Sequence, residues 1–599
     1  MDNIQKVNHC YVCANECMIK DGSTGLCKKY TINNGELIET APDKYLVVCG
    51  ISIETMPMLH FHPKGKFLQI TTTGCNFNCP GCISTILVQE IGQNSAALHH
   101  MTTEQIIEKA QKEQCIGISF LMNDPIASYF TFQNVAKKAK AADLLVGCST
   151  NGYLTRKSAK IMAAYIDYVN IGLKGFSDEE YMICGAKSIT PVLESIEIFY
   201  DAGIHIEVSC TYKKNDEKSV ENFASWLNKS NYDIPLQIMR YIPLEGADPA
   251  LEPTIREAEQ LAISLKKDLR YVYLFNSPGT EFLNTYCHHC GCLLIERDFY
   301  GPMGAKTRNI LLDSDQKCPA CQQSIPIKGL KQRAEYTEEA FEGGYPFTRG
   351  LDMIKAILIA SGVDKISDVV SIWERMLTGK NMNNWHHDLQ SIEKYILSIR
   401  KFAEYSGTEK KALELSTYMQ SKYDEIQEKL KEVTSKPRVY YVMGKPLFCL
   451  KGERFENQLV EAAGGISVNK EVKGDGRPGM NISIQQLNEL NPEVIFISSF
   501  LSNSIDDFYK ECLTKGIKIK AVHSKRIYTH TYPNWDFGSP RWILGLMNIA
   551  NILHPELFHF DMFEEAEYLY HEFYSTEFDA EKINLSFATP TSDWHWSDC

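Results

Sequence analysis

Three cysteines near residue 80 have a spacing that suits an iron–sulfur cluster. Cys75 is separated from Cys79 by three residues, and Cys79 from Cys82 by two. Three thiolates in so short a loop can bind three irons of a [4Fe–4S] cluster and leave the fourth iron open. A structural zinc ion, the alternative, needs four ligands. The spacing therefore favours a cluster whose open iron chelates a small molecule. The residues around such a cluster set its reduction potential.

Two further groups of cysteines flank this loop. The first contains four cysteines in a short span, which suits either tetrahedral zinc or an auxiliary [4Fe–4S] cluster, and its spacing does not choose between them. The second contains two Cys-x-x-Cys pairs about 27 residues apart, which is the spacing of a zinc ribbon. Zinc is favoured in the second group, and an auxiliary cluster is its rival. The groups are Cys10, Cys13, Cys17 and Cys27, and then Cys287, Cys290, Cys318 and Cys321.

The other cysteines are expected to have no ligand role. Scattered free cysteines usually behave as small buried hydrophobes. Cys292 and the neighbouring His288 and His289 are surplus to the second group, and we expect them to be bystanders. The scattered cysteines are Cys49, Cys115, Cys148, Cys184, Cys210, Cys449 and Cys512.

The segments around the central loop alternate between strands and helices. Continuous apolar runs predict buried strands, and apolar residues at helical spacing between them predict helices. Such alternation predicts a parallel sheet covered by helices. About six units predict an open or closed (β/α) barrel with ligands beyond the carboxyl ends of its strands. The predicted strands are 66–72, 116–122, 144–149, 168–173, 205–211, 235–241 and 270–275, and the predicted helices are 102–114, 132–142, 158–165, 191–202, 220–228 and 254–267.

A second, smaller α/β region follows the barrel. A long charged amphipathic helix is predicted at 388–430, and Pro437 ends it. Beyond it, strands are predicted at 438–443, 493–499 and 517–523. The expected regions are a Cys-rich segment at 1–64, the barrel at 65–280, a zinc-ribbon-like segment at 281–332, the second α/β domain at 335–575 and a tail at 576–599.

Composition and charge narrow the function classes. The 599-residue chain has a formal net charge of −13, so a general nucleic-acid surface is not expected. We find no apolar run of signal-peptide length at the N-terminus and no stretch of 18 apolar residues, so no membrane span is expected. Tightly grouped cysteines without a signal peptide favour metal binding over disulfides. We expect a cytoplasmic protein that works anaerobically, because an open-iron cluster would not survive an oxidising compartment.

The cysteine loop resembles the signature of the radical S-adenosylmethionine (radical SAM) superfamily. Residues 56–63 and 73–79 look like the entry to the barrel in relatives of pyruvate formate-lyase-activating enzymes, especially the AmmeMemoRadiSam branch. Residues 271–276 and 285–290 resemble the end of the same branch, so the resemblance covers about 1–330. It implies that S-adenosylmethionine binds the open iron and is cleaved by one electron to a 5′-deoxyadenosyl radical, which abstracts hydrogen from a substrate.

The resemblance also implies residues that contact the cofactor or substrate. After the second strand lies a variant of the Gly-Gly-Glu-Pro element that positions the amino group of the cofactor. After the third strand lies a Thr-Asn-Gly, as in the family, and the fourth strand ends in a lysine that is the candidate catalytic residue. These residues are Asn123, Asp124 and Pro125; Thr150, Asn151 and Gly152; and Lys174.

Two glycines depart from the family pattern. Gly81 stands before the third cysteine, where relatives often have an aromatic residue that packs near the adenine of the cofactor. We still expect Gly81 to adjoin the cofactor, with looser packing. Gly172 stands where many relatives carry an aspartate two residues before the lysine, so the role of that acid does not carry over.

The C-terminal region resembles substrate-binding proteins that carry iron–siderophore, haem or cobalamin to transporters. The resemblance rests on 459–467, which contains a Gly-Gly pair, on 484–495, and on the long helix as the link between two lobes. It implies a bilobal α/β domain with a ligand between its lobes. The candidate cleft residues are Tyr345, Arg349, His523, His530, Trp535 and Arg541.

Three functions compete at this stage. The first is a radical SAM enzyme that modifies a small molecule or metal complex, for example a tetrapyrrole or corrinoid, presented by the C-terminal domain. The second is an activase that installs a glycyl radical on a partner protein. The third is a non-catalytic carrier of a metal or cluster. Either enzyme would need a reductant such as flavodoxin or ferredoxin, and we expect neither nucleic acid nor membrane as a partner.

Overall fold

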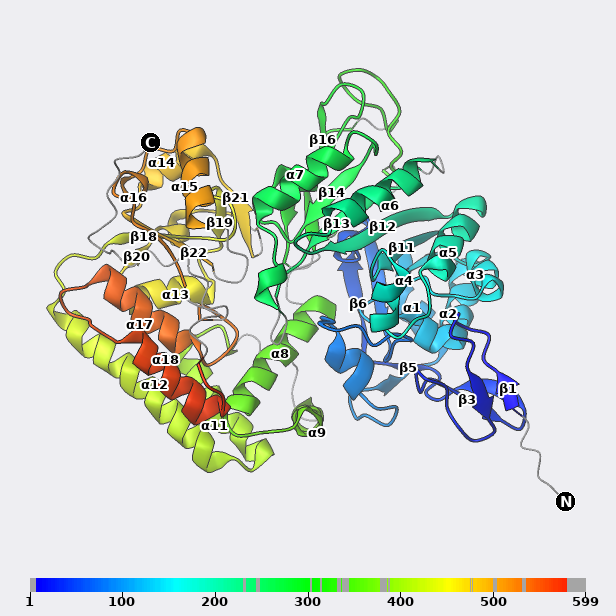
Figure 1. Ribbon diagram of the computed structural model, residues 1–599, viewed down its shortest axis with the longest axis horizontal. Helices are drawn as coiled ribbons and strands as arrows, with labels where there is room; N and C mark the ends of the chain where they lie inside the picture. Colours follow the sequence, from blue (N-terminus) through cyan, green and yellow to red (C-terminus); the bar gives the residue numbers. More distant parts are fainter. Residues whose placement is uncertain are drawn as a thin grey trace. The chain divides into compact units, whose positions relative to one another are not determined.

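The computed structural model describes residues 7–229, 233–243, 248–301, 304–312, 315–330, 336, 344–377, 385, 388–474, 476, 478–498, 504–530 and 535–578. The chain divides into two compact units (Figure 1). The first contains Met1–Asn276, Thr280–Leu351 and Val370–Asn383, and the second contains the remaining three segments. The predicted tail at 576–599 lies outside the described residues beyond position 578.

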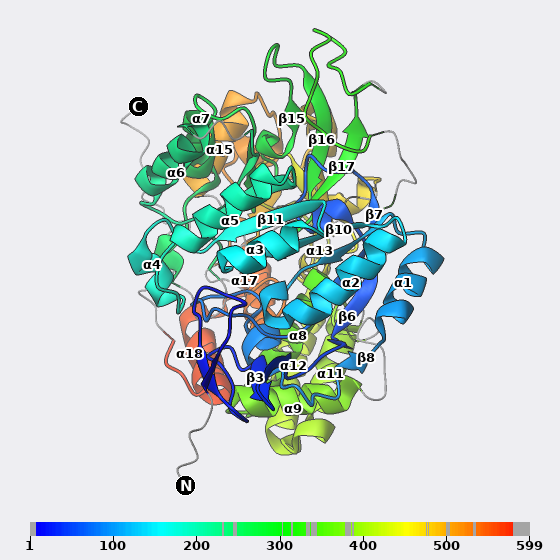
Figure 2. The ribbon, with the colours of Figure 1, turned by 90° about the vertical axis from the view of Figure 1, so that its right-hand side faces the viewer.

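The first unit is built on an eight-stranded sheet (Figure 2). Its strands lie in the order β14-β13-β12-β11-β10-β9-β7-β6, and all neighbours are parallel except β6 and β7. No pairing joins β14 to β6 in the part of the chain that is described, so the barrel is open. The strands are β6 (Val47–Ser52), β7 (Lys66–Thr71), β9 (Gly117–Phe120), β10 (Leu145–Thr150), β11 (Tyr168–Leu173), β12 (His205–Tyr212), β13 (Leu236–Arg240) and β14 (Val272–Phe275).

Helices connect the parallel strands, and Figure 2 shows α2, α3 and α5 in front of the strands that they join. The predicted α/β fold is confirmed, and the predicted helices and strands agree with the structure to within a few residues. One short helix, α4, was not predicted because six residues show little periodicity, although its Ser177 and Glu180 form a capping box. The helices are α1 (Thr103–Lys112), α2 (Tyr129–Ala141), α3 (Arg156–Ala163), α4 (Asp178–Ile183), α5 (Thr190–Asp201), α6 (Glu217–Lys229) and α7 (Ile255–Leu265).

A buried carboxylate holds a chain segment across the amino-terminal end of the barrel. Glu207, in the first half of β12, is fully buried. Its two oxygens accept hydrogen bonds from the amides of Leu59 and His60, at 2.9 and 2.8 Å, and one also accepts a bond from Gln237 Nε2 at 2.6 Å. His205 Nε2 lies 3.1 Å from the same carboxylate. Although burial raises the pKa of Glu207, these partners hold it below its usual value, so the group stays charged.

Two Cys-rich segments flank the barrel. The N-terminal one forms two small antiparallel pairs, β1 (Val7–His9) with β2 (Met18–Lys20), and β3 (Tyr30–Asn33) with β4 (Glu36–Glu39). The other forms an antiparallel sheet of β15 (Thr285–Tyr286), β16 (Leu293–Phe299) and β17 (Ala305–Ile310).

The second unit contains one described sheet, of six strands, and a group of helices. The sheet has the order β21-β19-β18-β22-β23, with β20 also on β18, and β20, β22 and β23 are parallel to the strand beside them. The strands are β18 (Arg438–Val442), β19 (Phe448–Leu450), β20 (Ile466–Ser467), β21 (Gly479–Asn481), β22 (Val494–Ile497) and β23 (Ile527–Thr529). The helices are α8 (Gly344–Ala360), which begins in the first unit, α11 (Ile392–Ser406), α12 (Glu409–Lys429), α13 (Phe455–Ala462), α14 (Ile484–Leu490), α15 (Ile505–Thr514), α17 (Trp542–Leu553) and α18 (Met562–Tyr574).

Two predictions for this unit were wrong in detail. The single helix predicted at 388–430 is two helices, α11 and α12, because Gly407 has a left-handed φ of 71° that ends α11. The strand predicted at 517–523 is instead a coil followed by the short helix α16 (Lys520–His523). The alternating apolar residues there are buried without pairing in a sheet. No described helix is long and apolar enough to cross a bilayer.

Replacing Glu207 tests its role in holding the segment at Leu59 and His60 against the barrel. The Glu207→Ala variant should lose about 3 kcal/mol of unfolding free energy, since several buried donors would lose a charged acceptor. Denaturant unfolding followed by circular dichroism measures the change. As a control, Glu197→Ala, at an exposed position of α5, should change stability by less than about 0.5 kcal/mol. Equal stability of both variants would contradict the role given to Glu207.

Candidate functional site

The predicted site residues follow neighbouring strands at the same end of the barrel. The cysteine loop comes after β7, Asn123 and Asp124 after β9, Asn151 after β10, and Lys174 after β11. These four strands are adjacent and parallel, so the residues that follow them meet at one edge of the sheet.

Asn123 fixes the start of the cysteine loop. Its Oδ1 accepts a hydrogen bond from the Thr72 amide at 2.9 Å, and its Nδ2 donates to Thr72 Oγ1 at 2.8 Å and to the Gly74 carbonyl at 3.2 Å. The side chain is buried. Asn123 therefore orients the loop directly, whereas its predicted contact with the cofactor stays a prediction.

Asp124 links the ends of two strands. One carboxylate oxygen accepts hydrogen bonds from the Ile126 amide at 3.0 Å and from Thr150 Oγ1 at 2.9 Å. The other accepts a bond from the Asn151 amide at 2.7 Å. Burial raises the pKa of Asp124 in spite of these bonds. Pro125 follows it as the first residue of a 3-10 turn (Pro125–Ser128) that leads into α2.

Asn151 connects Asp124 to the first cysteine of the loop. Its Nδ2 donates to Asn76 Oδ1 at 2.7 Å and lies 3.7 Å from Cys75 Sγ. The Phe77 amide points at the same sulfur at 3.4 Å. N–H groups aimed at a cluster thiolate stabilise its negative charge and raise the potential of the cluster. Gly152 has a φ of 68° and packs closely against Ile171, so a side chain there would be strained and crowded.

The Lys174 ammonium lies in the middle of this edge. A Cβ at Gly172 would lie 3.2 Å from Lys174 Nζ and 3.6 Å from Ser209 Oγ. The side chain is reached by solvent. Although desolvation lowers the pKa of Lys174, the thiolates of the cysteine loop, Cys79 foremost, raise it above its usual value. A cation at this place suits an anionic group of a bound molecule, and the catalytic role of Lys174 remains a prediction.

The third cysteine is preceded by open space. Gly81 has a φ of 65°, and no atom of the described residues lies within 4 Å of the position that its Cβ would take. The cysteine loop is otherwise supported from one side, where the Phe77 ring lies 5.1 Å from the Tyr153 ring and 6.0 Å from the Tyr181 ring. The surface beyond Gly81 is therefore free for a ligand.

Sequence reasoning missed one residue of this site. Cys184 is buried, as expected, but it also adjoins the cysteine loop, because its carbonyl accepts a hydrogen bond from the Asn78 amide at 2.9 Å. The residue caps α4, which the sequence analysis did not predict. The Ser177-x-x-Glu180 capping box is the sequence signal that could have predicted α4, the helix that ends at Cys184.

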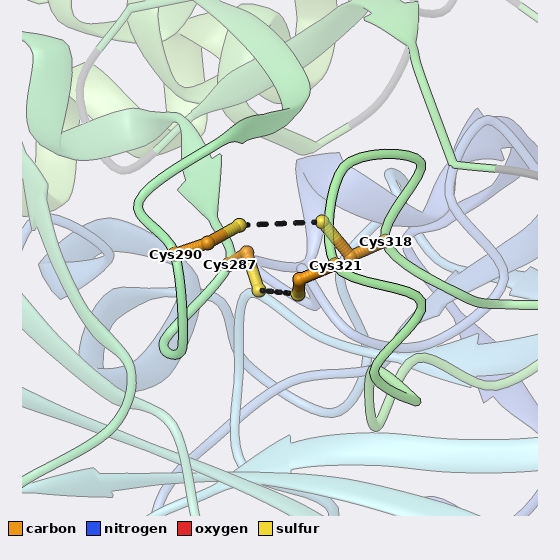
Figure 3. A group of neighbouring side chains, drawn as sticks. All are labelled: Cys287, Cys290, Cys318 and Cys321. Carbon is orange, nitrogen blue, oxygen red and sulfur yellow. Dashed lines mark hydrogen bonds between the residues drawn. The ribbon is translucent and has the colours of Figure 1, made fainter.

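The four cysteines of the C-terminal pairs converge on one point (Figure 3). The sulfurs of Cys287 and Cys321 are 3.6 Å apart, as are those of Cys290 and Cys318, and all four lie within 4.8 Å of one another. A tetrahedral zinc ion with Zn–S bonds of about 2.3 Å holds its sulfurs roughly 3.8 Å apart. The residues therefore fit a single tetrahedral ion without rearrangement.

These four cysteines lie at the opposite end of the barrel from the cysteine loop. The adjacent His288 contacts Tyr271, which comes directly before β14, with 3.0 Å between Nδ1 and the hydroxyl. Cys292 Sγ lies 3.5 Å from the Leu293 carbonyl and is not one of the convergent four. The group is thus placed to hold chain segments together, away from the carboxyl ends of the strands.

The four N-terminal cysteines are grouped more loosely. Cys10 and Cys13 are buried, and Cys17 and Cys27 are half-buried. Burial raises the pKa of the Cys13 thiol to about 12, and the nearby Cys27, Cys10 and Cys17 raise it as well. Yet no three of them meet the 4.8 Å spacing that the C-terminal group shows among the described residues.

A polar group lies at the carboxyl ends of three parallel strands in the second unit. The Tyr441 hydroxyl, from β18, is hydrogen-bonded to His530, which follows β23, with 2.6 Å between Oη and Nε2. Ser498, after β22, donates to Asp536 at 2.8 Å. His530 Nδ1 is buried and has no hydrogen-bond partner among the described residues, and burial lowers the pKa of His530 to about 4.

The structure brings together some of the predicted cleft residues of this unit. Arg541 lies over the rings of Tyr570 and Tyr574, and Trp535 and His530 both adjoin Gly545 of α17. His523 is exposed and stands apart in α16. The side chains of Tyr345 and Arg349 lie outside the described part of the structure.

Two protein-family models match separate parts of the chain. Residues 70–227 match the family described as Radical SAM superfamily, and residues 380–532 match the family described as Periplasmic binding protein. An uncharacterized protein of Methanocaldococcus jannaschii is 30% identical over 325 residues, which make up 53% of this chain and 95% of that protein.

Solved structures that are similar to about a third of the chain include binding proteins. A periplasmic solute binding protein of Veillonella parvula is 22% identical, with a TM-score of 0.31, over 34% of this chain and 64% of that chain. Helicobacter pylori Ceue with Ni(II) bound is 25% identical, with a TM-score of 0.28, over 32% of this chain and 61% of that chain. The chain thus spans less than two thirds of the length of these binding proteins.

Proposed function

The chain belongs to the radical SAM superfamily, and on this premise we propose that it is an enzyme that uses S-adenosylmethionine to modify a small molecule or metal complex. The superfamily domain implies a [4Fe–4S] cluster and S-adenosylmethionine. We assign the cluster to Cys75, Cys79 and Cys82. When bound, the cluster and cofactor supply one-electron cleavage to a 5′-deoxyadenosyl radical.

The observation that carries this assignment is the support around Cys75. Asn123, Asp124 and Asn151 are buried. Asn123 and Asn151 contact the cysteine loop directly, and Asp124 accepts a hydrogen bond from the Asn151 amide. Such rigid support holds a reactive centre in place. The chain's own residues also supply a cation, Lys174, and open space beyond Gly81 on the side where a small molecule would bind.

Cleavage of S-adenosylmethionine tests the assignment. After anaerobic reconstitution and reduction with dithionite, the wild type should form 5′-deoxyadenosine, measured by liquid chromatography. Cys75→Ser should lower the amount at least a hundredfold, because the cluster would lose one of its three protein ligands. Cys115→Ala, at a buried cysteine remote from the loop in sequence, should keep it. Undiminished cleavage by Cys75→Ser would refute the cluster assignment, and no cleavage by a well-loaded wild type would favour a carrier.

We assign a structural zinc ion to Cys287, Cys290, Cys318 and Cys321. The sulfur spacing fits one tetrahedral ion, and the position at the amino end of the barrel keeps it away from the reaction. Metal analysis of the wild type should find about one zinc per chain. Cys318→Ser should lose that zinc and melt at a lower temperature, whereas Cys292→Ser should keep it. Iron and sulfide in place of zinc at this group would overturn the assignment.

The C-terminal domain is proposed to hold the substrate. Its support is the match to binding proteins and the polar group at the carboxyl ends of β18, β22 and β23, which is where α/β sheets bind ligands. By analogy of fold the ligand is a metal chelate or tetrapyrrole-like molecule. The tetrapyrrole and chelate classes share metal centres and acidic groups that His530 and Arg541 could bind.

Anaerobic titrations with cobinamide, haemin and ferric citrate, followed by absorbance, test this proposal on the full chain. At least one probe should bind, and His530→Ala should weaken its binding about tenfold or more. Tyr440→Phe is the control, because the Tyr440 hydroxyl bonds to the Pro446 carbonyl at 3.2 Å rather than to His530. Failure of all three probes, or equal binding by both variants, would contradict the assignment.

A further inference from the structure

The four N-terminal cysteines face a common space. The Cys10 amide donates to the Cys17 carbonyl at 2.9 Å, which closes the loop that carries Cys13. A Cβ at Gly25 would lie 3.5 Å from Cys17 Sγ, so the turn before Cys27 packs against the same loop. Cys10 and Cys13 belong to the apolar core that they share with the barrel, and Cys17 and Cys27 pack against that core. None of the described cysteines forms a disulfide.

The four N-terminal sulfurs do not form the tight group that the four C-terminal sulfurs form. The C-terminal four lie within 4.8 Å of one another, but no three of the N-terminal four do. The cluster-binding trio, Cys75, Cys79 and Cys82, likewise does not meet that spacing. A cubane keeps its cysteine sulfurs farther apart than one zinc ion does, because four irons lie between them. A cluster, unlike one zinc ion, does not require its four sulfurs to lie as close together as those of the C-terminal group.

The N-terminal group adjoins the cysteine loop through direct contacts. Lys29, two residues after Cys27, donates to Thr73 Oγ1 at 2.9 Å. A Cβ at Gly74 would lie 2.0 Å from Lys29 Cε, so only glycine lets the lysine pass over the loop. On the other side, Cys13 forms a backbone bridge with Leu154.

A further contact leads from that bridge to the centre of the cysteine loop. The residue before Leu154 is Tyr153, and its ring lies 5.1 Å from that of Phe77, between the first two cysteines of the trio. The two cysteine groups are therefore separated by only one layer of packed side chains on each of two routes.

The outer side of the group is open to solvent. Met18 and Leu26, next to Cys17 and Cys27, are 65% and 76% exposed. Lys20 and Lys28 beside them are also exposed. Glu16 and Asp21 are exposed there too, so this surface combines apolar side chains with charges of both signs, and a protein could dock on it.

We propose that Cys10, Cys13, Cys17 and Cys27 bind a second [4Fe–4S] cluster that relays an electron to the first. The relay rests on the proposed radical SAM function, whereas the cluster itself does not. A one-electron donor of the flavodoxin or ferredoxin class would give up one electron to the second cluster. The second cluster would pass the same electron to the first and return to its oxidised state. No atoms are transferred in this step.

The full-length variant Cys75→Ser/Cys79→Ser/Cys82→Ser isolates the second cluster. After anaerobic reconstitution it should retain about four irons and four sulfides per chain, against about eight in the wild type. On reduction it should give the electron paramagnetic resonance signal of a reduced [4Fe–4S] cluster. A variant without iron, or with a second zinc at these cysteines, would overturn the proposal. Because this readout needs no cleavage of S-adenosylmethionine, it stands even if the proposed function fails.

The relay has a separate test. The double variant Cys17→Ser/Cys27→Ser should form 5′-deoxyadenosine with dithionite, a small reductant that reaches the first cluster directly. With reduced flavodoxin it should be at least tenfold slower than the wild type. Cys512→Ala, at a buried cysteine of the second unit, is the control and should match the wild type with both reductants. Equal rates of the double variant and the wild type with flavodoxin would overturn the relay.

Discussion

The site depends above all on the buried carboxylate of Asp124. It accepts hydrogen bonds from its own turn, through the Ile126 amide, and from the end of β10, through Thr150 and Asn151. Asn151 in turn reaches Cys75, so one acid joins two strand ends to the cysteine loop. A buried carboxylate is costly unless it is well hydrogen-bonded, and for that reason its partners are held in one geometry. The loop to which we assign the cluster thus rests on rigid strand ends.

Sequence patterns predicted the parallel barrel well because its strands are buried on both faces. A continuous apolar run such as 168–173 leaves little choice of structure, and the helices between the strands carry clear apolar stripes and caps. The patterns failed where the local sequence and the tertiary packing favour different structures. The alternation in 517–523 is that of a strand, yet its isoleucines are buried without a ladder partner. The helix break at Gly407 was missed because a glycine within a helical pattern is often tolerated.

The candidate site was predicted in its residues but not in its contacts. Position after successive strands placed Asn123, Asn151 and Lys174 at one edge, since parallel strands end together. Which atoms they bind depends on side-chain packing, which no spacing rule contains. Cys184 shows the limit: it is 105 residues from Cys79 in sequence, yet its carbonyl bonds to the amide of Asn78, the residue before Cys79. This contact forms because Cys184 ends a short helix, α4, that sequence patterns did not predict.

The two flanking cysteine groups show why sequence spacing alone does not identify a metal. Both offer four thiolates, and a short Cys-x-x-Cys occurs in each. Among the described residues, the four C-terminal sulfurs form the one cysteine group that lies within 4.8 Å and fits a single ion. Their places in the fold agree with this difference. The C-terminal group holds chain segments together at the amino end of the barrel, where no reaction is expected. The N-terminal group lies one packed layer from the cysteine loop, with Lys29 between them, where an additional redox centre would have a partner.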